Sequence, residues 1–226
     1  MSAPRRLRMD MHVHTLASYD SLSRPEQLLA AAVARGLDRV VVTDHNEVDG
    51  ALRLRQLDAE RFLVGEEVKT REGADIIGIL LTERIPKGTP ARETCERIRA
   101  QGGVVYLPHP FDTRRAGGAA LLDEIAELID VVEVHNARCY NPRLNARAAE
   151  WARQAGKLAG AGSDAHTPAE LGRGVVELPA FEPTRAALLA ALMQARVAGA
   201  LRSSPAVSLF STYAKLRKRL PGAPTL

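Results

Sequence analysis

The first predicted strand, residues 7–14, reads Leu-Arg-Met-Asp-Met-His-Val-His. Side chains two apart on a β-strand point to the same face, so His12 and His14 would lie side by side. Two imidazoles in this arrangement can bind a single cation. The stretch therefore predicts a strand with a metal site at its carboxyl end.

Short β-rich runs alternate with helical runs after this strand. The predicted strands cover residues 7–14, 39–43, 62–69, 75–81, 104–107, 131–135, 158–162 and 174–178. The predicted helices cover residues 25–35, 90–101, 121–129, 144–154 and 183–197, with Ser23 as a candidate cap of the first. The alternation predicts an α/β fold with a mostly parallel sheet.

The length of 226 residues fits one well-buried domain. The formal net charge of +4 is compatible with an anionic substrate but does not by itself indicate nucleic-acid binding. Cys95 and Cys139 form neither a metal-binding spacing nor a disulfide framework. The sequence shows no signal peptide and no apolar stretch that approaches a membrane span. We therefore expect a cytoplasmic protein with no membrane contact and no obligate protein partner.

All six histidines lie at or just after the end of a predicted strand. They are His12, His14, His45, His109, His135 and His166. The carboxyl ends of the strands in a parallel α/β barrel form one rim, and ligands bind at that rim. A single histidine is usually structural, but six at one rim beside Asp20, Glu67 and Asp164 predict a metal site. Imidazoles and carboxylates without thiolates favour Zn²⁺, Mn²⁺ or Fe²⁺.

The motifs around these histidines resemble those of the PHP (polymerase and histidinol phosphatase) domain family. In the family's order they are His12-Val13-His14, Ser18-Tyr19-Asp20-Ser21, Thr43-Asp44-His45-Asn46, Gly65-Glu66-Glu67, Pro108-His109-Pro110 and Gly162-Ser163-Asp164-Ala165-His166. The chain is most similar to the short stand-alone metal-dependent phosphoesterases of the family. The resemblance implies a distorted (β/α)7 barrel, similar to a TIM barrel, that binds two or three divalent metal ions.

The resemblance also implies three groups of ligands. They are His12, His14, Glu67 and Asp164 for one ion; Glu67, His109 and one further ligand for a second; and Asp20, His45 and His166 for a third. Glu67 is preferred to Glu66 because the family pattern is Gly-x-Glu, and Glu66 would face the opposite side of its strand.

Two positions depart from the family pattern. Many members have a histidine where this chain has Asp75, and an aspartate there would either complete the second site or weaken it. His135 is not a standard ligand position. It would complete the second site, contact the substrate, or only fix a loop.

The predicted reaction is hydrolysis of a phosphate ester. A hydroxide that bridges two ions near Glu67 and Asp164 would attack phosphorus, and either a rim histidine such as His166 or a metal-bound water would protonate the leaving group. Asp44 would orient an imidazole.

Arginines that follow the rim histidines are candidate phosphate ligands, because a guanidinium matches phosphate oxygens. These candidates are Arg114, Arg115 and Arg138, of which Arg138 is preferred.

The substrate class that the resemblance implies is a small phosphorylated compound, such as a nucleotide or short oligonucleotide. Two alternatives stay open. One is a metal hydrolase of the amidohydrolase type, which also begins with His-x-His on its first strand. The other is a non-catalytic, regulatory metal-binding domain. The sequence does not distinguish a phosphomonoester substrate from a phosphodiester substrate.

The end of the chain differs from the rest. Residues 203–226 contain the basic stretch Lys215-Leu216-Arg217-Lys218-Arg219. Such a stretch fits either a contact with an anionic surface or the solvated face of a terminal amphipathic helix, and we predict the second, structural role. The expected division is a phosphoesterase barrel at residues 1–202 and a basic tail at residues 203–226, both parts of one unit.

Overall fold

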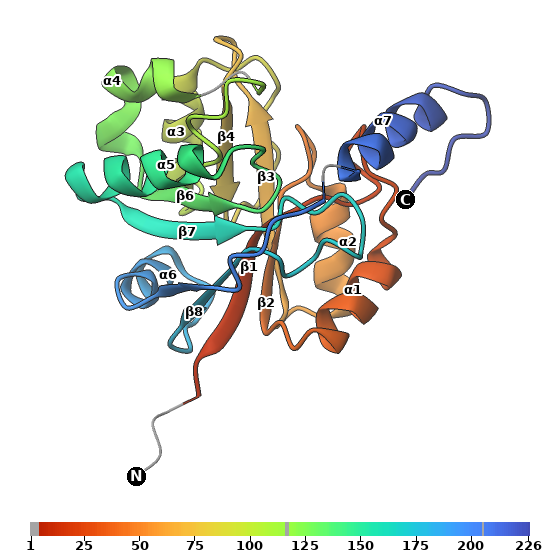
Figure 1. The fold of residues 1–226 in the computed structure, drawn as a ribbon, viewed down its shortest axis with the longest axis horizontal. Coiled ribbons are helices and arrows are strands. Elements are labelled where there is room, and N and C mark those ends of the chain that lie inside the picture. The colour runs from red at the N-terminus through yellow and green to blue at the C-terminus, as the bar shows by residue number, and fades with distance from the viewer. Residues whose placement is uncertain (1–4, 116–117, 205) are drawn as a thin grey trace.

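The computed structural model describes residues 5–115, 118–204 and 206–226. A nine-stranded sheet forms a nearly closed barrel with helices around it (Figure 1). The strands are β1 (Leu7–Val13), β2 (Arg39–Val42), β3 (Phe62–Lys69), β4 (Asp75–Ile79), β5 (Val104–Leu107), β6 (Val131–Asn136), β7 (Leu158–Gly162), β8 (Val175–Leu178) and β9 (Arg196–Ala198). The α-helices are α1 (Pro25–Ala34), α2 (Asp49–Leu57), α3 (Ala91–Ala100), α4 (Leu122–Ile125), α5 (Pro142–Gln154), α6 (Arg185–Leu192) and α7 (Val207–Lys218). The predicted α/β barrel is confirmed.

The sheet is mixed, so the expectation of a mostly parallel sheet is wrong. Its order is β7-β6-β5-β4-β3-β2-β1-β8-β9. The β3–β4, β4–β5, β1–β8 and β8–β9 pairs are antiparallel, and the other four pairs are parallel. Residues 70–74 join β3 to β4, which is enough for a hairpin turn but too short for the crossover that parallel strands need. The first residue of β4 therefore lies at the edge where β3 ends.

The segment after β7 connects the last parallel strand back to the first. The amide of Asp164 donates to the carbonyl of His12 over 2.8 Å, and the amide of His14 donates to the carbonyl of Ala165 over 2.9 Å. A Cβ on Gly162 would collide with His12 and with the carboxylate of Glu133. Glycine thus allows β7 to approach β1 closely, and this contact places the motif after β7 beside the first two histidines.

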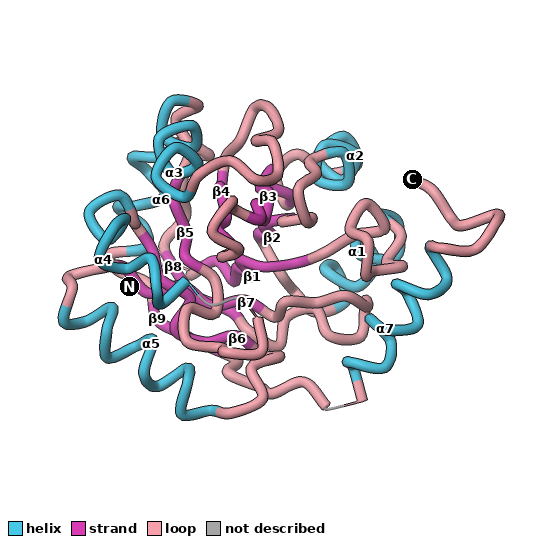
Figure 2. The backbone as a smooth tube through the Cα atoms, turned by 90° about the horizontal axis from the view of Figure 1, so that it is seen from above, coloured by secondary structure: helices cyan, strands magenta, loops and turns pink. Residues whose placement is uncertain are grey.

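Apolar side chains fill the barrel below the rim. Along β2, Val41 belongs to the inner core cluster, whereas Val40 and Val42 belong to the cluster between sheet and helices. Leu188 of α6 joins the inner cluster. Since Leu178 at the end of β8 pairs with Leu7 at the start of β1, this helix follows at the end of the barrel opposite the histidines. Figure 2 shows the helices on the outside of the strands. The rim is therefore the end that is available to a ligand.

Several local predictions differ from the structure. Helix α2 was not expected, and the last two residues of the predicted helix 183–197 belong instead to the edge strand β9, which pairs with β8. Residues 121–129 contain short 3-10 and α-helical turns in place of one helix. Ser23 does not cap α1, because Arg24 is the capping residue and the Ser23 hydroxyl donates to the carbonyl of His166. The Ser23 hydroxyl instead stabilises the segment after β7 that carries His166.

Among residues 5–115, 118–204 and 206–226, no helix has both the length and the apolar character that crossing a membrane requires. The division at residue 202 stays a prediction, and residues 1–4 and 205, which it includes, lie outside the described residues.

Candidate metal centre

One rim of the barrel brings together nine of the ten predicted metal ligands. They are His12, His14, Asp20, His45, Glu67, Asp75, His109, Asp164 and His166. Most of them lie at or after the ends of β1, β2, β3, β5 and β7. Asp75 reaches the same rim from the start of β4, because this strand is antiparallel to its neighbours.

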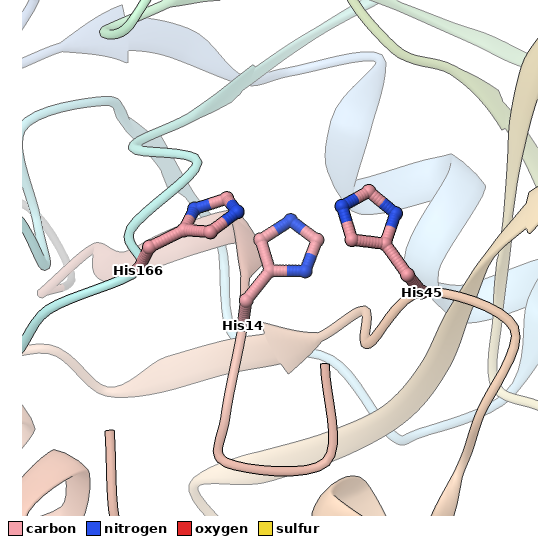
Figure 3. A group of neighbouring side chains, drawn as sticks. All are labelled: His14, His45 and His166. Atoms are coloured by element: carbon pink, nitrogen blue, oxygen red, sulfur yellow. The ribbon is translucent and has the colours of Figure 1, made fainter. Parts of the chain in front are cut away.

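Three groups of donor atoms are close enough to share cations, with the atoms of each group within 4.8 Å of one another. The groups are His12, Glu67 and His109; His12, His14 and Asp164; and His14, His45 and His166. Figure 3 shows the last group, in which rings from three separate segments converge. His12 and His14 each belong to two groups. The donors therefore form one continuous cluster.

Glu67 occupies the middle of this cluster and is 1% exposed. Its Oε1 lies 3.1 Å from Nε2 of His109, and its Oε2 lies 3.1 Å from Nδ1 of His45 and 3.3 Å from Nε2 of His12. The two oxygens thus face different imidazoles. This is the arrangement that a carboxylate bridging two ions requires.

The donor set fits divalent cations. Oδ1 of Asp20 and Nδ1 of His109 are buried and have no hydrogen-bond partner among the described residues. Oδ1 of Asp20 lies 3.2 Å from Nε2 of His166 and 3.7 Å from Nε2 of His45. These carboxylate and imidazole donors suit Zn²⁺, Mn²⁺ or Fe²⁺. The group around Asp20 would hold one ion and the group around Glu67 the others.

The two neighbouring glutamates of β3 point to opposite sides, as the strand period predicts. Whereas Glu67 faces the cluster, Oε2 of Glu66 accepts a hydrogen bond from the amide of Ile85 over 2.8 Å. Burial raises the pKa of Glu66 to about 7. Glu66 is therefore a structural residue outside the candidate site.

We expect Glu66→Gln to raise the melting temperature by about 5 °C at pH 8 and to have little effect at pH 4. An acid whose pKa is raised by folding stabilises the folded state below its ordinary pKa, and this contribution is lost as the pH rises through about 7. At pH 8 the wild type holds a buried charge that glutamine lacks. Calorimetry at both pH values checks this, and a gain at pH 4 alone would contradict it.

A buried carboxylate behind the ligands fixes the orientation of one imidazole and the backbone of a second histidine. Nδ1 of His12 donates to Oε1 of Glu133 over 3.0 Å, and the other oxygen of Glu133 accepts from the backbone amide of His109 over 2.8 Å. The Nδ1 donation of His12 leaves its Nε2 free to bind a cation. Glu133 was missed in the sequence, although a carboxylate inside the apolar run Val-Val-Glu-Val of β6 is a signal for such a role.

His14 is oriented through an intermediate residue. Its Nδ1 lies 3.0 Å from the hydroxyl of Ser18, which donates in turn to Asp44 over 2.6 Å. Asp44 also accepts bonds from the amide and hydroxyl of Thr15. Asp44 thus helps to orient the imidazole of His14, but indirectly, through the hydroxyl of Ser18. Burial lowers the pKa of His14, which favours the neutral imidazole that binds metals.

Replacing Glu133 with glutamine should weaken the binding of the ion at His12 by about 10–100-fold, because the fixed carboxylate makes the imidazole a stronger and better-oriented ligand. Competition with a chromophoric chelator measures the change. Glu150→Gln, at an exposed position on α5, is the matched control. Equal metal affinity in both variants would rule out the orienting role.

Two predicted ligands have backbone conformations that residues other than glycine seldom adopt. His109 has φ of 29° and Asp164 has φ of 53°. Both follow the ends of strands, β5 and β7, and both side chains join the donor cluster. Strained backbone of this kind concentrates at functional positions, where the surrounding structure holds it in place.

The central carboxylates remain ionised. Burial opposes the ionisation of Glu67, but the imidazoles of His45 and His12 outweigh it and hold the pKa of Glu67 well below its usual range. Burial likewise opposes ionisation of Asp164, and Arg115 and His12 outweigh it, so the pKa of Asp164 is also well below its usual range. Both are therefore anionic ligands near neutral pH.

The three predicted phosphate-binding arginines differ in their contacts. Arg138 donates to Oε1 of Glu170 over 2.8 Å and to the carbonyl of Val207 over 3.0 Å, and its side chain is only 8% exposed. Its preference as a phosphate ligand is therefore not supported, since its donors are used within the protein. Arg115 contacts Asp164, and Arg114 stacks on Tyr140 with Cζ 3.6 Å from the ring centroid. These two arginines line the cavity and remain candidates.

His135 does not join the cluster. The pairing of β6 with β7 shifts between Glu133 and His135, and this irregularity separates their side chains. Nε2 of His135 lies 3.4 Å from the carbonyl oxygen of Leu201, and Nδ1 of His135 lies 3.4 Å from the side-chain amide nitrogen of Asn145. The predicted role of His135 as a ligand is withdrawn on this geometry, because Glu133 occupies the position on β6 that faces the site.

A cavity of about 490 Å³ opens above the donor cluster. It is large enough for a substrate of nucleotide size. One wall comes from α7, through Ser208, Ser211, Thr212 and Lys215. The interpretation of the basic tail as only a solvated face is therefore wrong for this side of the helix.

Comparison with known proteins agrees with the fold. The PHP domain matches residues 10–88, and the PHP-associated family matches residues 142–197. The chain is 37% identical to the uncharacterized protein MJ1587 of Methanocaldococcus jannaschii over 145 residues, which are 58% of this chain and 82% of that protein. The rim and its donors define a barrel with a candidate metal centre rich in histidine and carboxylate side chains. The chain belongs to the PHP domain family.

Two solved structures share the fold. One is a two-domain protein from Bacteroides vulgatus, described as containing a predicted PHP-like metal-dependent phosphoesterase, with a TM-score of 0.69 and 20% identity over 88% of this chain and 67% of that chain. The other is the lesion-specific endonuclease EndoQ from Pyrococcus furiosus, with a TM-score of 0.60 and 15% identity over 85% of this chain and 57% of that chain. At these identities the likeness establishes the fold alone.

Proposed function

We propose that this protein hydrolyses phosphate esters with the aid of two or three divalent cations. The observation that carries the proposal is the convergence of three imidazoles on the two oxygens of Glu67, beneath a cavity large enough for a substrate. Mn²⁺, Zn²⁺ and Fe²⁺ fit this donor set. Bound cations would supply an activated water and neutralise charge on the phosphoryl group.

The chain's own residues have distinct roles in this proposal. Glu67 and Asp164 hold the centre together as anionic ligands in the predicted first group. Asp20 and His45 would hold the part of the centre nearest to α7, and His166 would serve there either as a ligand through Nε2 or as the proton donor to the leaving group. Oδ2 of Asp75 accepts a hydrogen bond from Lys69 over 2.7 Å, whereas its buried Oδ1 has no hydrogen-bond partner among the described residues and would be available to a cation.

Nucleotides or short oligonucleotides are the proposed substrate class. The resemblance to stand-alone PHP phosphoesterases suggests this class, and the fold shared with a lesion-specific endonuclease is compatible with it. The guanidinium groups of Arg114 and Arg115 line the cavity and would bind phosphate oxygens.

Metal analysis combined with a substrate panel tests the proposal. The panel contains p-nitrophenyl phosphate, bis-p-nitrophenyl phosphate, nucleoside bisphosphates, short oligonucleotides and cyclic amides. We expect several ions per chain and turnover of at least one phosphoester, lost in His45→Ala and kept in the control His135→Ala. Activity on the amides alone would support an amidohydrolase-type enzyme. Full metal loading without turnover of any compound would favour a regulatory metal-binding domain.

A further inference from the structure

Helix α7 lies outside the regions that match the PHP families, yet it forms one wall of the cavity. The family matches end at residue 197, and α7 covers Val207–Lys218. Figure 1 shows this helix on the same side of the barrel as α1 and α2, away from α3, α4, α5 and α6. Ser211 and Ala214 are buried against the protein. The helix is therefore positioned by the fold and presents a defined face to the rim.

The cationic side chains of Lys218 and Arg138 hold α7 against the loops that carry predicted ligands. The ammonium of Lys218 donates to the carbonyls of Leu16 and Ser18, just before Asp20. Arg138 donates to the hydroxyl of Ser211 over 2.9 Å and to Glu170 over 2.8 Å. These contacts hold the helix at a fixed place beside the metal centre.

This position brings Lys215 close to the predicted ligands. Its Nζ lies 3.7 Å from Oδ2 of Asp20 and 5.3 Å from the centre of the Tyr19 ring. The Tyr19 ring in turn lies 4.9 Å from that of His45. The side chain of Lys215 is 43% exposed and lines the cavity. The ammonium is thus directed to the space above Asp20 and His45.

Four other cationic side chains line the cavity. Lys69 contacts Asp75 over 2.7 Å, Arg115 contacts Asp164, Arg138 contacts Glu170, and Arg114 stacks on Tyr140. Among the described residues, Lys215 has only the 3.7 Å contact with Asp20 and the more distant Tyr19 ring. An ammonium with uncommitted donors at an open cavity is suited to bind an anion.

We propose that Lys215 is a substrate-binding residue, whose ammonium binds a phosphoryl oxygen of the ligand that lies over Asp20, His45 and His166. This inference rests on the proposed function and adds that α7 is part of the substrate site. Lys215 contacts the ligand, whereas the rim residues hold the metal ions. Lys218 and Arg138 are positioning residues, because they hold α7.

The test measures binding of inorganic phosphate to the metal-loaded full chain by calorimetry, with metal content determined for every variant. Lys215→Met should weaken phosphate binding about tenfold, the effect of losing one charge-assisted hydrogen bond. Its metal content should equal that of the wild type. Lys215→Arg should recover most of the affinity. Arg219→Met, at an exposed position of the same basic stretch that does not line the cavity, should bind phosphate as the wild type does.

The outcomes separate this inference from the proposed function. If the wild type hydrolyses phosphoesters while Lys215→Met keeps full phosphate affinity, the role of Lys215 is wrong and the function stands. If Lys215→Met loses its metals, Lys215 supports the metal centre and the inference is also wrong. If the metal-loaded wild type neither binds phosphate nor hydrolyses any phosphoester, the proposed function fails together with the inference.

Discussion

Replacing Glu67 with glutamine is expected to lower kcat/KM for a phosphoester by about a thousandfold or more. The two oxygens of Glu67 contact His109 on one side and His12 and His45 on the other, so one neutral substitution affects two candidate ions at once. Metal ions contribute several kcal/mol to stabilisation of a phosphoryl-transfer transition state, and about 4 kcal/mol corresponds to a thousandfold in rate. Steady-state kinetics and metal analysis on the same preparation measure the effect.

Glu66→Gln is the matched control, because the neighbouring residue of β3 faces away from the cluster. It should keep the metal content and kcat/KM of the wild type. A Glu67→Gln variant with full metal content and near-normal activity would show that the centre does not depend on a bridging carboxylate.

Removal of the cations with a chelator is expected to lower the melting temperature by about 10–20 °C. A ligand at 100 times its dissociation constant stabilises a protein by about 2.7 kcal/mol, and two such ions contribute about 5 kcal/mol. In a chain of this size each kcal/mol corresponds to about 2–4 °C. Without cations, the buried donors of the cluster also face one another with no ion to neutralise the carboxylates.

Differential scanning calorimetry with and without chelator, followed by readdition of metal, measures this shift. The Glu67→Gln variant should respond less to the chelator than the wild type does. A wild-type melting temperature that is insensitive to both chelator and added metal would argue against a tightly bound metal centre.

The positions of the site residues follow from simple rules of strand geometry. His12 and His14 share a face because of the two-residue period, and His45, His109 and His166 meet because β1, β2, β5 and β7 all end at one rim. The same period predicts that Glu66 and Glu67 face opposite sides, and the resemblance to the family pattern Gly-x-Glu selects Glu67. These predictions need only local patterns and one rule about barrels, so they could be made from the sequence.

Other features depend on tertiary packing that local patterns do not contain. The irregular pairing of β6 with β7 places Glu133 behind the site and turns His135 away from it. No turn-forming residue between Glu133 and His135 marks this irregularity in the sequence. Arg138 has the position expected of a phosphate ligand, but its donors are taken up by Glu170 and by α7, which is about 70 residues further along the chain. The antiparallel direction of β4 could have been inferred from the short connection before it.

The contact between β7 and β1 has a consequence for how the protein matures. The hydrogen bonds from Asp164 and His14 that bring these strands together also align two members of the donor cluster. A nascent chain on the ribosome that has not yet exposed this segment would lack both the final strand contact and a high-affinity site. Assembly of the proposed metal centre would therefore require completion of the fold, so that premature or truncated chains would not compete for scarce ions.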